Sequence, residues 1–83
     1  MKWLLYVLQC SDGTYYTGVT TDIQRRVTEH NNSKRGAKYT KTRRPVKVVY
    51  CSEYASRSLA QKAEYRFKQL NRAEKERIIN ERK

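Results

Sequence analysis

An 83-residue chain in which 37% of the residues are hydrophobic can build one small core, so we expect residues 1–83 to form a single domain. Lys and Arg together number 19 and Asp and Glu number 8, which gives a net charge of +11 at pH 7. This charge favours DNA or RNA as the partner, because a polyanion releases counterions when a basic protein binds it. A basic protein without such a partner is the alternative.

The cysteines and the apolar runs exclude several other classes of protein. Cys10 and Cys51 are too few for a disulfide framework or for a zinc site, which needs about four ligands. We interpret both as buried hydrophobic residues in a reducing compartment. The apolar run Trp3–Leu8 is shorter than the core of a signal peptide, and no run approaches the roughly 20 residues of a membrane span. We therefore expect a cytoplasmic protein with no membrane partner.

The first elements predict a β-hairpin. Residues 3–9 are β-prone and almost continuously apolar, which is typical of a strand that is covered on both faces. Residues 11–13, Ser-Asp-Gly, have turn chemistry, and residues 14–17 form a second β-prone run. Tyr16 is expected to face the opposite side of the sheet from its neighbour Tyr15. Whether Tyr6 shares a face with Tyr16 depends on the register, which the sequence leaves open.

A helix is expected next, with Asp22 or Thr21 as its cap; it runs to about His30 and ends at the Asn31–Asn32 pair. At the helical period, four residues fall within one sector that packs on the sheet. These are Ile23, Arg26, Val27 and His30. Arg26 and His30 are four residues apart and so are neighbours on that sector.

The outer face of this helix is polar. Arg25 and Glu29 lie there, and we expect them to form a solvated ion pair. An arginine and a histidine on the inner sector are harder to explain as surface residues. Arg26 and His30 are therefore candidates for chemistry.

Residues 32–45 are predicted to form a long polar loop with six positive charges and no acid. Such a length in a small domain is typical of a functional or a disordered loop. Tyr39 can stack on a base or pack back on the body of the protein. We expect the loop to bind nucleic acid through Lys34, Arg35, Lys38, Tyr39, Lys41, Arg43 and Arg44.

The remainder predicts one strand and two helices. Residues 46–51 read as a strand, and Lys47 within it favours an edge position. A helix follows from Ser56 or Ser58 to Leu70. Its apolar stripe is expected to contain Leu59, Ala63, Phe67 and Leu70, with Glu64 at the border.

Asn71 and Glu74 have the spacing of a capping box for a last helix, residues 72–82. The order is then β-β-α-β-α-α. It predicts an α+β fold in which helices flank a small three-stranded antiparallel sheet.

Taken together, several motifs resemble the GIY-YIG nuclease domain. Leu4–Leu5–Tyr6 and Tyr16–Thr17–Gly18 stand ten residues apart, and Arg26, His30 and Glu64 follow at matching spacing. The resemblance covers the whole chain and is closest to the small stand-alone bacterial members. The first motif keeps only its tyrosine, the second has threonine in place of isoleucine, and valine follows it where some members carry a lysine.

This resemblance implies a metal-dependent endonuclease that hydrolyses DNA phosphodiester bonds. Glu64 would be the ligand of one Mg²⁺ or Mn²⁺, and Arg26 would bind the scissile phosphate. Tyr6 or Tyr16 would take a proton from the attacking water. His30 would position that water, relay its proton or hold a tyrosine in place.

Alternative interpretations exist for the protein and for its residues. The protein can be a DNA- or RNA-binding module without cleavage activity, or a nuclease subunit that is active only with a partner. Glu64 can simply pair with Lys68, four residues later on the helix. Gly18 can be a positive-φ exit from its strand.

Overall fold

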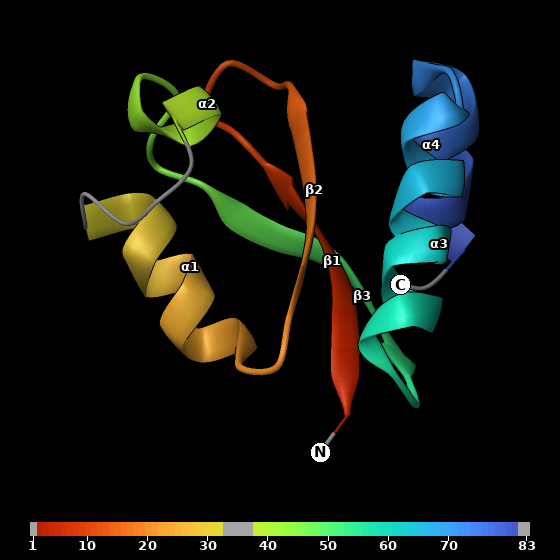
Figure 1. The fold of residues 1–83 in the computed structure, drawn as a ribbon. Helices are drawn as coiled ribbons and strands as arrows, with labels where there is room; N and C mark the ends of the chain where they lie inside the picture. Colours follow the sequence, from red (N-terminus) through yellow and green to blue (C-terminus); the bar gives the residue numbers. More distant parts are fainter. Residues whose placement is uncertain (1, 33–37, 82–83) are drawn as a thin grey trace.

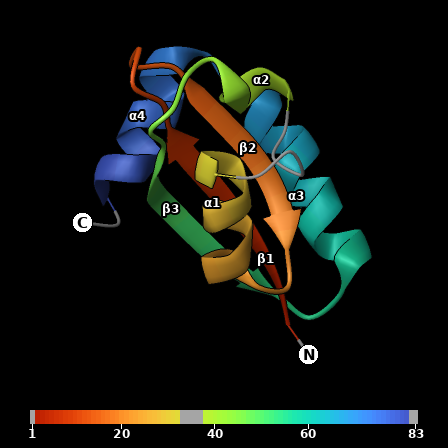
Figure 2. The ribbon, with the colours of Figure 1, turned by 90° about the vertical axis from the view of Figure 1, so that its left-hand side faces the viewer.

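The computed structural model describes residues 2–32 and 38–81, in which helices cover both faces of a three-stranded antiparallel sheet (Figure 1). The strand order in the sheet is β2-β1-β3, so β1 is the central strand. The elements along the chain are β1 (Trp3–Gln9), β2 (Tyr15–Thr20), α1 (Ile23–Asn32), α2 (Lys38–Lys41), β3 (Lys47–Tyr54), α3 (Arg57–Gln69) and α4 (Arg72–Glu81). The helices α1 and α2 lie on one face of the sheet and α3 and α4 on the other; Figure 2 views the molecule from the α1 side.

The central strand β1 is covered on both faces, as its continuous apolar sequence predicts. Tyr6 and Leu8 belong to a cluster under α1, whereas Val7 belongs to a second cluster that includes Phe67 of α3 and Ile79 of α4. All three β1 side chains are at most 1% exposed. A sheet with two covered faces thus gives this small protein two thin cores.

The register of the hairpin decides which tyrosines meet. Leu8 pairs with Tyr16 and Tyr6 pairs with Gly18, and directly opposite residues point to the same face of a sheet. Tyr6 and Tyr16 therefore share the α1 face, and Tyr15 packs on the opposite side, as expected. At the turn between the strands, Gly13 has a φ of +85°, a conformation that glycine adopts without strain.

Two expectations about α1 are confirmed and one needs correction. The helix ends at Asn32, within the expected Asn31–Asn32 pair. Glu29 pairs with Arg26, at 3.0 Å, instead of with Arg25 on the outer face, and its side chain is only 17% exposed. The cap prediction is confirmed, because Asp22 Oδ1 accepts a hydrogen bond from the backbone N–H of Arg25.

The polar segment after α1 contains a short helix, α2, that the sequence did not indicate. Beyond it, β3 is an edge strand as predicted, but it continues to Tyr54. Ser56 is the N-cap of α3, and its Oγ accepts from the backbone N–H of Leu59. The apolar stripe of α3 is shifted from the predicted one, since Ala60 is fully buried and Leu59 is 47% exposed.

The capping box of α4 is confirmed. The backbone N–H of Asn71 donates to the Glu74 carboxylate at 3.0 Å, and the N–H of Glu74 donates to Asn71 Oδ1 at 2.9 Å. These reciprocal bonds satisfy donors at the start of a helix that buries little apolar surface. In the part of the chain that the structure describes, no helix is long and apolar enough to cross a membrane.

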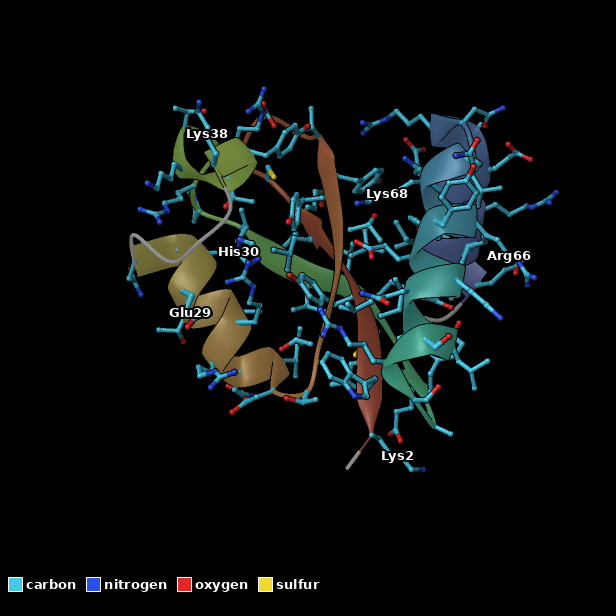
Figure 3. The ribbon with its side chains drawn as sticks, in the orientation of Figure 1. Lys2, Glu29, His30, Lys38, Arg66 and Lys68 are labelled. Atoms are coloured by element: carbon cyan, nitrogen blue, oxygen red, sulfur yellow. The ribbon has the colours of Figure 1, made fainter. Side chains whose placement is uncertain are left out.

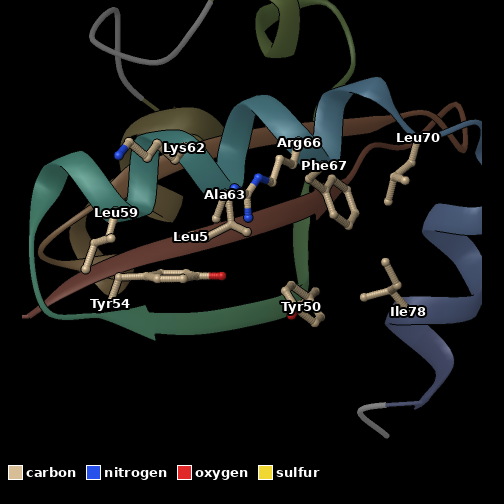
Figure 4. A pocket seen from close by; sticks show the side chains of 10 residues that line it. All are labelled: Leu5, Tyr50, Tyr54, Leu59, Lys62, Ala63, Arg66, Phe67, Leu70 and Ile78. Carbon is tan, nitrogen blue, oxygen red and sulfur yellow. The ribbon is translucent and has the colours of Figure 1, made fainter.

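The sheet face under α3 and α4 carries an open apolar groove (Figure 4). Leu59, Ala63 and Phe67 of α3 line one side of it, and Tyr50 and Tyr54 of β3 line the other. No carboxylate or imidazole is among the described residues that line it. The side chains suited to phosphodiester chemistry lie elsewhere, since Tyr6 and His30 meet on the α1 face of the sheet.

Candidate active site

Tyr6 lies at the centre of the candidate site. It comes from the central strand, is 1% exposed, and its hydroxyl lies 3.0 Å from Nε2 of His30. His30 comes from α1 (Figure 3), so the sheet and the helix each contribute one partner to this contact. The side chain of Tyr16 completes an aromatic group, with its ring centroid 5.1 Å from that of His30 and 6.5 Å from that of Tyr6.

Gly18 makes room for the Tyr6 hydroxyl. A Cβ atom at Gly18 would lie 2.5 Å from the hydroxyl oxygen and 2.7 Å from Cζ of the ring, which is closer than real atoms pack. Gly18 lies inside β2, and its φ is not positive. The glycine is therefore explained by the space that Tyr6 occupies, and its interpretation as a positive-φ exit from the strand is wrong.

Arg26 brings a positive charge to the Tyr6 hydroxyl. Burial lowers the pKa of Arg26, but its hydrogen bonds with Tyr6 and Glu29 outweigh that effect and raise it overall. The guanidinium is therefore permanently charged. It is three-quarters buried, as its side chain is 25% exposed, and it is oriented by the Glu29 carboxylate at 3.0 Å. A fixed, partly desolvated guanidinium is suited to binding a phosphate.

Tyr6 itself is protonated at neutral pH. Burial raises its pKa above the ordinary value of 10.0 and the nearby Tyr16 and Glu64 act in the same direction, while the hydrogen bond and charge of Arg26 oppose them. A phenol in this state can take a proton from water only if it passes its own proton to a neighbour. The neighbour in contact is Nε2 of His30.

His30 is uncharged at neutral pH. It is completely buried, and burial, followed by the charge of Arg26, lowers its pKa from 6.5 to about 4. Its second ring nitrogen, Nδ1, lies 2.9 Å from Oγ1 of Thr40, which is also completely buried. Both nitrogens of the imidazole thus have a defined partner.

A stack of side chains covers the Tyr16 side of the site. The ring of Tyr39 stacks on Tyr16 with a centroid distance of 5.9 Å, and the Arg43 guanidinium lies 4.0 Å from the centroid of Tyr39. Asp12 in the hairpin turn pairs with Arg43 at 3.1 Å. Of the two interpretations of Tyr39, the structure favours packing on the body of the protein, although the residue is still 38% exposed.

Glu64 comes from the helix on the other side of the sheet. The helix α3 packs against both β1 and β2, and the Glu64 charge is close enough to raise the pKa of Tyr6. Its side chain is 22% exposed and forms the expected ion pair with Lys68, at 3.1 Å. An ion pair between residues four apart on a helix contributes only about 0.3–0.5 kcal/mol, so Lys68 can be replaced by another cation at little cost.

A metal ion at this site would have to bind through few protein ligands. Among residues 2–32 and 38–81, no group of three or more His, Cys, Asp and Glu side chains is placed to hold a metal ion. Mg²⁺ commonly binds through one or two carboxylates and takes its remaining ligands from water and substrate phosphates. A single carboxylate such as Glu64 is enough for that kind of binding. It is not enough for a cation that requires several protein ligands.

The basic residues expected to bind nucleic acid separate into different groups. Lys38 and Lys41 are exposed on α2. Arg43 and Arg44 instead contact the protein, since Arg43 donates to the carbonyl of Tyr39 and Arg44 donates to the carbonyl of His30 at the end of α1. Lys34 and Arg35 lie outside the described residues.

Sequence reasoning missed three residues that shape the site. Thr40 contacts the buried imidazole, and Glu29 orients Arg26. Asn31 exchanges two hydrogen bonds with the backbone of Val46, which ties the end of α1 to the segment before β3. Glu29 comes three residues after Arg26, and residues at this spacing on a helix are neighbours, so their contact could have been anticipated. The period of the helices and strands does not identify Thr40 or Asn31.

Comparison with known proteins shows the family of this chain. A model of the GIY-YIG catalytic domain matches residues 2–77. The chain belongs to the GIY-YIG family. This membership implies a nuclease-type function, and GIY-YIG nucleases generally depend on a divalent metal ion.

Relatives and solved structures place the chain among small GIY-YIG proteins. It is 52% identical over 77 residues to the UPF0213 protein DP2720 of Desulfotalea psychrophila, a match that covers 93% of this chain and 70% of that protein. It is 57% identical over 75 residues to a UPF0213 protein of Halobacterium salinarum, a match that covers 90% of this chain and 96% of that protein. The solution structure of the UPF0213 protein BH0048 from Bacillus halodurans superposes with a TM-score of 0.62 at 41% identity. The solution structure of the protein EF2693 from E. faecalis superposes with a TM-score of 0.67 at 46% identity. Each structural match covers 96% of this chain and 84% of the other, so the expected fold is confirmed.

Proposed function

We propose that this protein is a metal-dependent endonuclease that hydrolyses DNA phosphodiester bonds, with residues 1–83 acting as one GIY-YIG domain. One observation carries the proposal. The buried Tyr6 hydroxyl is in contact with both a charged guanidinium, Arg26, and a neutral imidazole, His30, and lies within the field of the Glu64 carboxylate.

Tyr6 is the proposed base. As water attacks phosphorus, the water proton passes to the Tyr6 oxygen while the Tyr6 proton passes to Nε2 of His30, 3.0 Å away. The negative scissile phosphate offsets the charge of Arg26, which otherwise disfavours a protonated His30. The ring of Tyr16 packs against the imidazole, with a centroid distance of 5.1 Å, and this packing is its proposed role.

Arg26 is proposed to bind the scissile phosphate and to stabilise the charge that develops on it. Its guanidinium offers several donors in a fixed plane, and Glu29 holds that plane in place. A Mg²⁺ or Mn²⁺ ion on Glu64 would neutralise charge on the phosphate and on the leaving oxygen. Cleavage ends when the P–O bond to the leaving oxygen breaks and that oxygen takes a proton from solvent, after which His30 returns its extra proton through Tyr6 to solvent.

The proposal is tested with a nicking assay on supercoiled DNA, with Mg²⁺ or with EDTA. Glu64→Gln and Tyr6→Phe are expected to lower the rate at least about 10²-fold, because each removes a group that acts directly in the transition state. Tyr16→Phe keeps the ring and is expected to retain most activity. Tyr65→Phe is a matched control, as Tyr65 is 68% exposed on α3 next to Glu64.

Each alternative has a distinct outcome in this assay. Undiminished nicking by Glu64→Gln would attribute the activity to a contaminant. DNA binding with no cleavage by any form would favour a binding module, and cleavage of RNA alone would change the substrate. Loss in Tyr16→Phe with retention in Tyr6→Phe would make Tyr16 the base.

A further inference from the structure

The hydrogen-bond pattern around the buried imidazole carries one inference beyond the proposed function, on whose catalytic roles it rests. His30 and Thr40 are both 0% exposed, so no bulk water competes for their polar atoms. Nε2 of His30 lies 3.0 Å from the Tyr6 hydroxyl, and Nδ1 lies 2.9 Å from Thr40 Oγ1. The ring therefore sits between two hydroxyl groups, and its single proton must be on one side or the other.

The buried Tyr6 hydroxyl decides between the two arrangements. Its oxygen faces the Arg26 guanidinium, which can only donate, so the oxygen accepts there. Its own proton has Nε2 of His30 as an acceptor at 3.0 Å, and Nε2 must be unprotonated to accept it. A neutral imidazole in this position carries its proton on Nδ1 and donates it to Thr40.

We propose that Thr40 is a positioning residue: its hydroxyl holds the proton of His30 on Nδ1 and thereby keeps Nε2 ready to receive the proton of Tyr6. Thr40 touches neither substrate nor the Tyr6 hydroxyl in this role. It acts through the imidazole, as partners of catalytic and metal-binding histidines do elsewhere.

The surroundings of Thr40 are built to keep its hydroxyl in place. The carbonyl of Thr40 accepts the backbone N–H of Arg43 at 3.0 Å, and the Arg43 side chain donates to the carbonyl of Tyr39 at 2.9 Å. The backbone N–H of Ser11 donates to the carbonyl of Arg43 at 2.9 Å, and Asp12 pairs with its guanidinium. The hairpin turn thus fastens α2 across the site, so the threonine cannot readily move away from the ring.

Removing the hydroxyl has a defined chemical consequence. In Thr40→Val the Nδ1 proton would be buried without an acceptor, which costs on the order of 1–3 kcal/mol. The other tautomer avoids this cost, since its Nε2–H can donate to the second lone pair of the Tyr6 oxygen, whose own proton then turns away from the ring. In that tautomer Nε2 cannot accept the Tyr6 proton, and the proposed path from water through Tyr6 to His30 is closed.

The test is the tautomer of His30, read from the ¹⁵N shifts of its ring nitrogens by NMR at pH 7. The chain has one histidine, so its signals need no assignment against others. Wild type, Thr40→Ser and Tyr6→Phe are expected to show the proton on Nδ1, because all three keep a hydroxyl at position 40. Thr40→Val is expected to shift the population to Nε2–H. A wild-type ring with Nε2–H, or a Thr40→Val ring that keeps Nδ1–H, would overturn the proposal.

Kinetics separate this role from a merely structural one. In Thr40→Val, kcat is expected to fall on the order of 10²-fold, the contribution of general acid–base catalysis, with KM within about twofold of wild type. Thr40→Ser is expected to restore kcat. If these substitutions acted through loss of structure, both Thr40→Val and Thr40→Ser would show a lowered unfolding midpoint. If wild type cleaves no nucleic acid, the proposed function fails, while the tautomers still decide the position of the proton.

Discussion

Acid is expected to destabilise this protein through its single histidine. His30 is buried in the folded state with a pKa of about 4, whereas an unfolded chain gives it a value near 6.5. Between these two pH values the unfolded state binds a proton that the folded state excludes. The free energy of unfolding should therefore be unaffected by His30 above pH 6.5, fall as the pH drops toward 4, and level off below that.

The size of the effect follows from the pKa difference. At about 1.36 kcal/mol per pH unit, a depression from 6.5 to about 4 corresponds to a loss of about 3 kcal/mol. A domain of 83 residues has a typical total stability of roughly 4–12 kcal/mol, so this loss at pH 4 would remove a large share of it. The two causes are complete burial of the ring and the positive charge of Arg26 beside it.

Urea unfolding from pH 4 to pH 8 measures this effect, with His30→Gln as the matched variant. Carboxylates titrate in both proteins, so the difference between their stabilities isolates the histidine. We expect wild type to lose about 3 kcal/mol more than His30→Gln on going from pH 7 to pH 4. Parallel curves, or a His30 titration near pH 6.5 by NMR, would refute the reasoning about a neutral buried imidazole.

Two further predictions test other contacts of the site. Gly18→Ala should cost about 1–3 kcal/mol and lower cleavage, because the added Cβ would lie only 2.5 Å from the Tyr6 hydroxyl oxygen; unchanged urea unfolding would contradict this. Lys38→Ala should weaken DNA binding and lower the slope of log affinity against log salt concentration by about one, because Lys38 is exposed. Arg44→Met should mainly lower the free energy of unfolding, because Arg44 contacts backbone carbonyls of α1. Fluorescence anisotropy at several salt concentrations measures both affinities, and an equal change in salt dependence would show that Arg44 also contacts the phosphates.

Local sequence patterns determined the elements and several of their ends. The apolar run of β1, the Ser-Asp-Gly turn, the Asp22 cap and the Asn71 capping box each depend on residues within a few positions of one another. Such features are properties of short segments, so they can be predicted before any tertiary contact is known. Short α2 lacks this support, because four residues carry almost no periodic signal.

Contacts between distant segments determined the roles of the charged residues. The sequence placed Glu29 beside Arg25, but burial of the Arg26 side chain against the sheet draws Glu29 to that guanidinium. Likewise, Arg43 and Arg44 look like phosphate-binding residues in a polar segment, yet carbonyls and an aspartate elsewhere in the fold engage them. The role of a long basic side chain depends on which partners the tertiary structure brings within its reach.

By itself, the sequence determined the order of the strands and helices, the excess of positive charge and the residues that mark the GIY-YIG family. Only the tertiary structure decided that Gly18 lies under Tyr6, that Thr40 meets His30, and that a carboxylate from the opposite helix acts on the Tyr6 hydroxyl. The physical reason is the hairpin register together with burial. A shift of the register by one residue would turn Tyr6 to the other face of the sheet, and the protonation of Tyr6 and His30 depends on the solvent exclusion that folding creates.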